Sequence, residues 1–121
     1  MLFQERFDLL KQSGQANEES VAATKLVIEI IEKYYGIQLT DELGAPMVNH
    51  LAVTLKKLLE GKTLTKAPEE IWQELQDYPE EYDLAGRIVA RVENKLKISL
   101  ARDELGFIAI HLCKIKIETG P

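Results

Sequence analysis

The chain has 121 residues, of which 45% are hydrophobic and 29% charged, and its formal net charge is −5. This length and composition predict a single domain with its own core, and the acidic balance argues against direct nucleic-acid binding, which needs a basic surface. No apolar run reaches the ~18 residues of a membrane span. The first residues do not read as a signal peptide and the one cysteine cannot form an internal disulfide, so we expect a cytoplasmic protein.

The chain begins with a lead-in segment, residues 1–15, whose apolar side chains suggest a short helical or irregular stretch that docks on the core. A helix is predicted over 17–35, with Asn17 or Ser20 as its cap and Gly36 at its end. Apolar residues recur there at helical spacing. This stripe consists of Val27, Ile30, Ile31 and Tyr34.

A second long helix follows and ends at Gly61. Proline fits a helix only in the first turn, so this helix is expected to start near Gly44–Pro46, or near Asp41 with a kink. Thr40 is a candidate cap. Residues 62–67 are interpreted as a linker. The apolar stripe of the helix consists of Met47, Leu51, Leu55 and Leu58.

The second half of the chain predicts three more helices. A short one follows Pro68 and ends near Asp77, and a long one starts at Pro79. The last, over about 101–117, is apolar on most of its circumference. The expected apolar face of the helix after Pro79 consists of Tyr82, Ala85, Ile88, Val89, Val92 and Leu96. With no convincing strand pattern, the fold class is all-α, a compact five-helix bundle.

One phrase occurs twice. Asp41-Glu-Leu-Gly44 returns as Asp103-Glu-Leu-Gly106, and each copy is followed by a His-Leu pair. The tetrapeptide alone can be coincidence, because acids are common in the first turn of a helix. The histidines, His50 and His111, are the only two in the chain.

The histidines do not sit in a metal or catalytic pattern. Zinc sites use three or four ligands at characteristic spacing, and none is present. Cys113 lies two residues from His111, which puts the two side chains on different helix faces, so they form no local catalytic pair. There is also no glycine-rich phosphate loop. We therefore expect no metal, no cofactor and no enzymatic activity.

Two readings of the histidines remain. A half-buried histidine can be a satisfied core residue. Alternatively, a neutral imidazole nitrogen, with a reference pKa of about 6.5, can accept a phosphoryl group. The added negative charges would repel nearby acids and attract arginine or lysine, which can repack a helix interface.

At two places the sequence resembles the PTS regulation domain (PRD) of bacterial antiterminators and activators. These are Tyr78-Pro-Glu-Glu-Tyr-Asp-Leu-Ala85 and Asp103-Glu-Leu-Gly-Phe-Ile-Ala-Ile-His-Leu112, within a likeness that covers residues 15–117. The resemblance implies a five-helix domain, here residues 16–118, that commonly forms a homodimer. It implies phosphoacceptors at His111 and His50. It also implies phosphoryl donors, the phosphocarrier protein HPr or enzyme II components of the sugar phosphotransferase system.

The sequence departs from the family pattern beside His50. The family usually has Asp before this histidine and often Arg seven residues after it, whereas this chain has Asn49 and Lys57. Lysine does not reproduce a bidentate arginine clamp, so His111 is the favoured acceptor. Arg87 and Arg91 are expected to lie on a solvated face, and they are accessory residues only if that face turns towards a histidine.

Two functions are therefore carried forward. The first is a phosphorylation-controlled regulatory module that modulates transcription through protein contacts, without contacting nucleic acid or membrane. The alternative is a helical dimerisation or interaction protein that takes no phosphate. PRDs usually occur in tandem behind a nucleic-acid-binding domain, so a single PRD with about 15 preceding residues is either part of a larger regulator or, as a start at Met1 favours, a stand-alone PRD.

Overall fold

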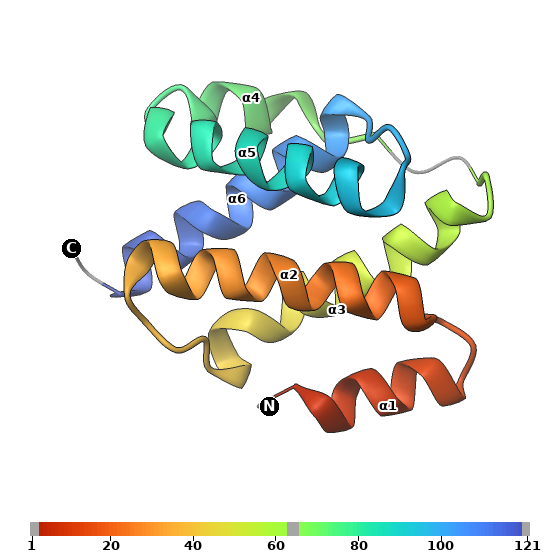
Figure 1. The fold of residues 1–121 in the computed structure, drawn as a ribbon. Coiled ribbons are helices and arrows are strands. Elements are labelled where there is room, and N and C mark those ends of the chain that lie inside the picture. Colours follow the sequence, from red (N-terminus) through yellow and green to blue (C-terminus); the bar gives the residue numbers. More distant parts are fainter. Residues whose placement is uncertain (1–2, 63–65, 120–121) are drawn as a thin grey trace. The chain divides into compact units, whose positions relative to one another are not determined.

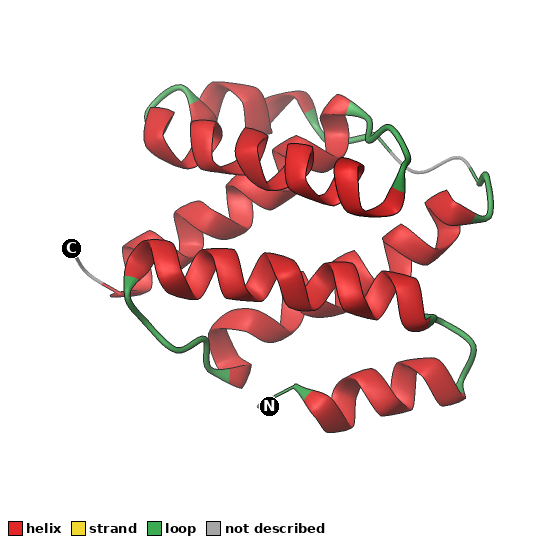
Figure 2. Ribbon diagram, viewed as in Figure 1, coloured by secondary structure: helices red, strands yellow, loops and turns green. Residues whose placement is uncertain are grey.

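The computed structural model describes residues 3–62 and 66–119, so residues 63–65 of the predicted linker lie outside the described part. In these residues all regular secondary structure is helical (Figure 2). Six helices form, one more than the five expected. They are α1 (Gln4–Gln12), α2 (Glu18–Tyr35), α3 (Asp41–Leu59), α4 (Glu69–Leu75), α5 (Pro79–Leu96) and α6 (Arg102–Thr119). None of the described helices is long and apolar enough to span a membrane.

The additional helix is α1, formed by most of the lead-in segment. Phe3 and Phe7 are four residues apart and therefore lie on one face of it. Both side chains are almost fully buried, with relative exposures of 2% and 0%. Packing of this face, more than helix propensity, accounts for so short a helix.

The helices pack into two compact units, α1 to α3 and α4 to α6. Each unit consists of a short helix followed by two long helices, and the long helices pack against each other as α2 with α3 and α5 with α6 (Figure 1). The short helices α1 and α4 lie against α3 and α6 respectively.

The ends of α2 and the start of α3 follow the sequence closely. Asn17 caps α2 by accepting a hydrogen bond from the Ser20 backbone at 2.8 Å, and the Ser20 hydroxyl accepts one from the Asn17 backbone at 3.0 Å. Gly36 ends α2 in the left-handed conformation, with φ of 66°. The Thr40 hydroxyl accepts a bond from the Leu43 backbone, so α3 starts at Asp41 and carries proline inside it.

In the second unit, Pro79 occupies the first turn of α5, where its missing N–H is tolerated. The prediction that Tyr82 belongs to the apolar face of this helix is wrong, because its side chain is 38% exposed. The residues buried on α5 are Glu81, Leu84, Ala85, Ile88, Val89, Val92 and Leu96. Tyr82 lies beside this face, and Leu84 takes the core position.

The hairpin α2–α3 and the hairpin α5–α6 share one register, offset by 61 residues, the separation of His50 and His111. Glu32 and Glu93 make the same bond in each: their Oε2 atoms accept the backbone N–H of Leu39 at 2.8 Å and of Leu100 at 2.7 Å. Core positions also correspond. Equivalent buried pairs are Val27/Ile88, Ile28/Val89, Ile31/Val92, Met47/Ile108, Val48/Ala109, Leu51/Leu112 and Ala52/Cys113.

The two glycines of the repeated tetrapeptide each lie against an aromatic ring. A Cβ added to Gly44 would lie 2.7 Å from Cζ of Phe3, and one added to Gly106 would lie 2.8 Å from Cη2 of Trp72. In each unit the third helix therefore accepts an aromatic ring against its backbone, from just before α1 in one unit and from α4 in the other.

Candidate functional site

The first candidate phosphoacceptor, His50, lies in the middle of α3 and is half-buried. The next residue, Leu51, is only 2% exposed and belongs to the core. His50 therefore lies at the edge of the buried face of α3, where an imidazole keeps contact with solvent.

Arg6 of α1 reaches the residue before this histidine. Its Nη1 donates to Oδ1 of Asn49 at 3.4 Å, and its Nη2 pairs with Oδ1 of Asp41 at 2.8 Å. The Nε atom of Arg6 is buried and has no hydrogen-bond partner in the described residues. One guanidinium thus bridges the start and the middle of α3, and it holds the Asn49 amide with its oxygen towards α1.

An open groove of about 660 Å³ runs beside this bridge. It is lined by Glu5, Arg6, Leu9, Leu10, Gln15, Asp41, Asn49 and Val53. Sequence reasoning missed Arg6, because the contact joins residues 43 positions apart. One signal was available in the sequence: Arg6 directly precedes Phe7, so a cation lies beside the apolar face by which the lead-in segment packs on the core.

Lys57 lies in the last turn of α3 and is exposed. Seven residues separate it from His50, so both lie on one side of the helix, roughly 10 Å apart along the axis. A long lysine side chain can span much of that distance.

The second candidate, His111, lies in α6 and is also half-buried. On this helix Ile108, Leu112 and Ile115 are buried, and Leu105 is half-buried. Unlike Asn49, the residue before this histidine, Ile110, is apolar and half-buried.

A buried carboxylate joins the two long helices of this unit. Glu81 of α5 is 1% exposed, and its Oε1 lies 3.4 Å from Nζ of Lys116 in α6. The negative charge of Glu81 raises the pKa of Lys116. Burial, followed by the charges of Glu81 and Glu74, raises the pKa of the Cys113 thiol to about 11. This thiol is therefore protonated at neutral pH and is no nucleophile there.

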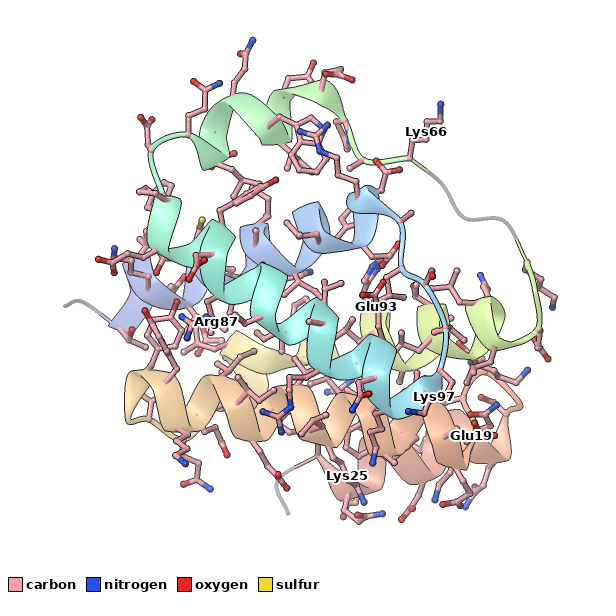
Figure 3. The ribbon with its side chains drawn as sticks, turned by 45° about the horizontal axis from the view of Figure 1, so that its top comes forward. Glu19, Lys25, Lys66, Arg87, Glu93 and Lys97 are labelled. Atoms are coloured by element: carbon pink, nitrogen blue, oxygen red, sulfur yellow. The ribbon has the colours of Figure 1, made fainter. Side chains whose placement is uncertain are left out.

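The two arginines named as accessory residues are exposed. Arg87 lies in the middle of α5 (Figure 3), and its Nε pairs with Oδ2 of Asp83 at 3.3 Å. Arg91 follows one turn later. The exposure of both side chains fits the expected solvated face.

Potential metal ligands do not gather in the described residues. Among residues 3–62 and 66–119, no group of three or more His, Cys, Asp or Glu side chains is placed to hold a metal ion.

With this geometry in hand, comparison with known proteins identifies the class of the chain. The PRD domain family matches residues 25–114, which include both histidines, the whole of α3, α4 and α5, and most of α2 and α6. The chain belongs to the PRD family. α1 lies outside the matched region.

A named relative extends the match. The chain is 23% identical over 111 residues to the transcription antiterminator LicT of Bacillus subtilis. The alignment covers 92% of this chain and 37% of LicT, so the chain spans little more than a third of that relative's length. No solved structure matches the chain.

Proposed function

We propose that this chain is a regulatory module controlled by the sugar phosphotransferase system, which modulates transcription through protein contacts and has no catalytic activity of its own. Membership of the PRD family and the likeness to an antiterminator support this proposal. The observation that carries it is the equivalent placement of His50 and His111, both half-buried, in two hairpins of one register.

The chemistry asks little of the protein beyond an accessible imidazole. A neutral ring nitrogen of His111 or His50 attacks the phosphorus of a phosphohistidine or phosphocysteine donor, HPr or an enzyme II component. One P–N bond forms on the acceptor, and the donor's bond to phosphorus breaks with its electron pair returning to the donor. The product carries about two negative charges at the edge of a packed helix pair.

That charge explains how a modification is converted into a signal. It appears beside buried side chains, where repulsion from acids and attraction to lysine or arginine change the preferred packing. On the unit that carries His50, Arg6 contacts the preceding residue, Asn49, and Lys57 lies seven residues beyond the histidine along α3. Arg6 of α1 already bridges Asn49 and Asp41 of α3. A shift of α3 at Asn49, next to His50, would therefore be passed on to α1.

The alternative is a dimerisation or interaction protein that takes no phosphate. Asn49 and Lys57 favour it at His50, because Asn49 lacks the charge of the usual aspartate and Lys57 lacks the bidentate geometry of the usual arginine. The close match around His111 favours phosphorylation there.

Intact mass spectrometry separates the two. The chain is incubated with enzyme I, HPr and phosphoenolpyruvate, as wild type, His50→Ala, His111→Ala and the double variant, with circular dichroism as the folding control. A gain of about 80 Da per phosphoryl group that is lost in the His111→Ala variant is the expected result. No gain with HPr or with any enzyme II component would establish the interaction-only function.

A further inference from the structure

A small aromatic groove lies in the second unit, formed by α4, the start of α5 beside it and the first residue of α6 (Figure 1). Its volume is about 360 Å³. Leu75 is buried, Trp72 is half-buried, and the other lining side chains are exposed. An open hollow of this size suits one or two side chains of a peptide. The lining residues are Trp72, Leu75, Gln76, Pro79, Tyr82 and Arg102.

Arg102 is the only charged residue that lines the aromatic groove. Its guanidinium lies 3.9 Å from the centre of the Trp72 ring, a cation–π contact that fixes the cation at the edge of the groove. In the described part of the chain Arg102 makes no ion pair with a carboxylate. Its N–H donors are therefore available to an anion that comes from outside the chain.

Folding accounts for only part of the aromatic surface of the groove. Trp72 packs one edge on Gly106, where an added Cβ would lie 2.8 Å from Cη2 of the ring. Tyr82, in contrast, is 38% exposed although the neighbouring Leu84 and Ala85 are buried. Tyrosine, tryptophan and arginine are the residue types enriched at binding hot spots. Their grouping around one buried leucine therefore suits recognition of a partner's apolar side chain.

The helices around the aromatic groove restrict how much negative charge an occupant can carry. Residues 67–86 contain seven acidic residues and no lysine or arginine. None of these acids is among the residues that line the groove. Charges within a Debye length, about 8–10 Å, still repel one another in solution. The groove therefore favours a segment with one carboxylate placed at Arg102 over a segment with a run of carboxylates.

We propose that the aromatic groove docks a segment of a partner protein in which one glutamate or aspartate stands beside a leucine or phenylalanine. The carboxylate pairs with Arg102, whose planar guanidinium matches two carboxylate oxygens. The apolar side chain lies over Leu75, between Trp72 and Tyr82. Because Arg102 is already stacked on Trp72, little side-chain freedom is lost when the pair forms. Charge complementarity thus selects the partner, and the rings supply the short-range contact.

The tryptophan offers a direct test, because Trp72 is the only one in the chain. The full chain is titrated with short peptides, blocked at both ends, in which a single glutamate stands beside leucine or phenylalanine. A saturable change in Trp72 emission is expected, and the affinity should fall as salt is added. The same peptides with lysine in place of the glutamate should bind at least tenfold more weakly.

Variants locate the binding, and the anisotropy of labelled peptides follows it without relying on the tryptophan. Arg102→Gln should weaken binding about tenfold, whereas Arg102→Lys, which keeps the charge, should weaken it less. Tyr82→Ala should also weaken binding about tenfold. Lys114→Gln is the matched control, since it removes an exposed cation of the same helix outside the groove. Circular dichroism checks that each variant is folded.

Several outcomes would overturn the proposal. They are the absence of saturable binding by every single-glutamate peptide, equal binding by the lysine peptides, and equal binding by wild type and Arg102→Gln. A wild-type homodimer that Arg102→Gln dissociates would also overturn it, because a second copy would then fill the groove. Phosphorylation plays no part in these measurements, so their result is independent of the function proposed for the histidines.

Discussion

The hairpins α2–α3 and α5–α6 fix their turns with the same carboxylate bond but pass through the left-handed conformation with different residues. Glu32 and Glu93 each accept the N–H seven residues later. Beside that bond stand Gly36, which adopts a positive φ readily, and Lys97, which does not (Figure 3). The comparison teaches that the side-chain bond defines the turn, because it persists where the favourable glycine is absent.

The hairpins also differ around their histidines. Asn49 ties the first to α1 through Arg6, whereas the equivalent residue of the second, Ile110, is apolar. The second hairpin holds its helices together through Glu81 and Lys116 instead. Equivalent backbones therefore present their two histidines in different electrostatic surroundings.

The largest effect is expected from truncating equivalent core leucines. Leu51→Ala and Leu112→Ala should each cost about 2–5 kcal/mol, because both side chains are at most 2% exposed and leave a cavity. Urea unfolding followed by circular dichroism measures the cost. Leu9→Ala, at a position 66% exposed, is the control and should change stability by less than about 0.5 kcal/mol. A cost below about 1 kcal/mol at only one leucine would show that the hairpins are not packed alike.

Next come the glycines that receive aromatic rings. Gly44→Ala and Gly106→Ala should destabilise the chain by about 1–2 kcal/mol, because the added methyl overlaps Phe3 or Trp72. Gly86→Ala is the matched control inside α5, where the nearest atom lies 3.9 Å away. It should stabilise by up to about 1 kcal/mol through helix propensity. Thermal melts distinguish the signs, and stabilisation by all three would refute the ring contacts.

Removal of the turn carboxylates is expected to cost about as much at one hairpin as at the other. Glu32→Ala and Glu93→Ala should each lose about 1–2 kcal/mol, since a backbone N–H is left without its charged acceptor. Glu32→Gln and Glu93→Gln keep an acceptor oxygen and should lose less. Chemical denaturation of the four variants gives the comparison. If alanine and glutamine variants were equally stable, these bonds would not define the turns.

Alkaline pH should lower the stability of the hairpin α5–α6, which carries the Cys113 thiol. Cys113 stands where the first hairpin has Ala52, and its folded-state pKa is about 11. The folded chain holds this proton more tightly than the unfolded chain, so its stabilising contribution is complete below about pH 8.5 and is lost as pH rises through about 11. The Cys113→Ala variant should lose less stability over that range in pH-dependent melts. Identical pH profiles would contradict burial of the thiol as the cause.

The smallest change is expected at Lys97. Lys97→Gly should raise stability by about 0.5–1 kcal/mol, the left-handed penalty of a non-glycine residue less the entropy that glycine loses on folding. Gly36→Ala should have the opposite sign. Differential scanning calorimetry can resolve both. A destabilised Lys97→Gly variant would mean that the lysine side chain contributes contacts of its own.

Much of the fold could be predicted from local signals in the sequence. Asn17, Gly36 and Pro79 act on the backbone next to them, so the ends of α2 and the start of α5 were predicted correctly. Such signals are short-range and survive in any tertiary context. Pro46 was a weaker signal, because it allowed α3 to start either near Gly44–Pro46 or near Asp41. The structure has the second of these, with α3 beginning at Asp41.

Other features depended on contacts that a linear pattern does not contain. Tyr82 has the spacing of a core residue, yet the width of the buried face leaves it at the edge. α1 is too short to be recognised by periodicity alone. It is stabilised by the burial of Phe3 and Phe7 in the core. Arg6, the cation beside Asn49, was missed for the same reason. The positions of both histidines on half-buried helical faces were predictable, because helical spacing alone determines them.

Pro46 gives α3 a weak point that concerns the order in which parts of the molecule open. Lacking an N–H, it cannot donate to the carbonyl of Glu42, so the first turn of α3 is joined to the rest by one bond fewer. That turn is held from outside by Arg6 on Asp41 and by Phe3 on Gly44. We therefore expect α1 and the first turn of α3 to open together, so that their amide protons exchange while the remainder of α3 stays closed.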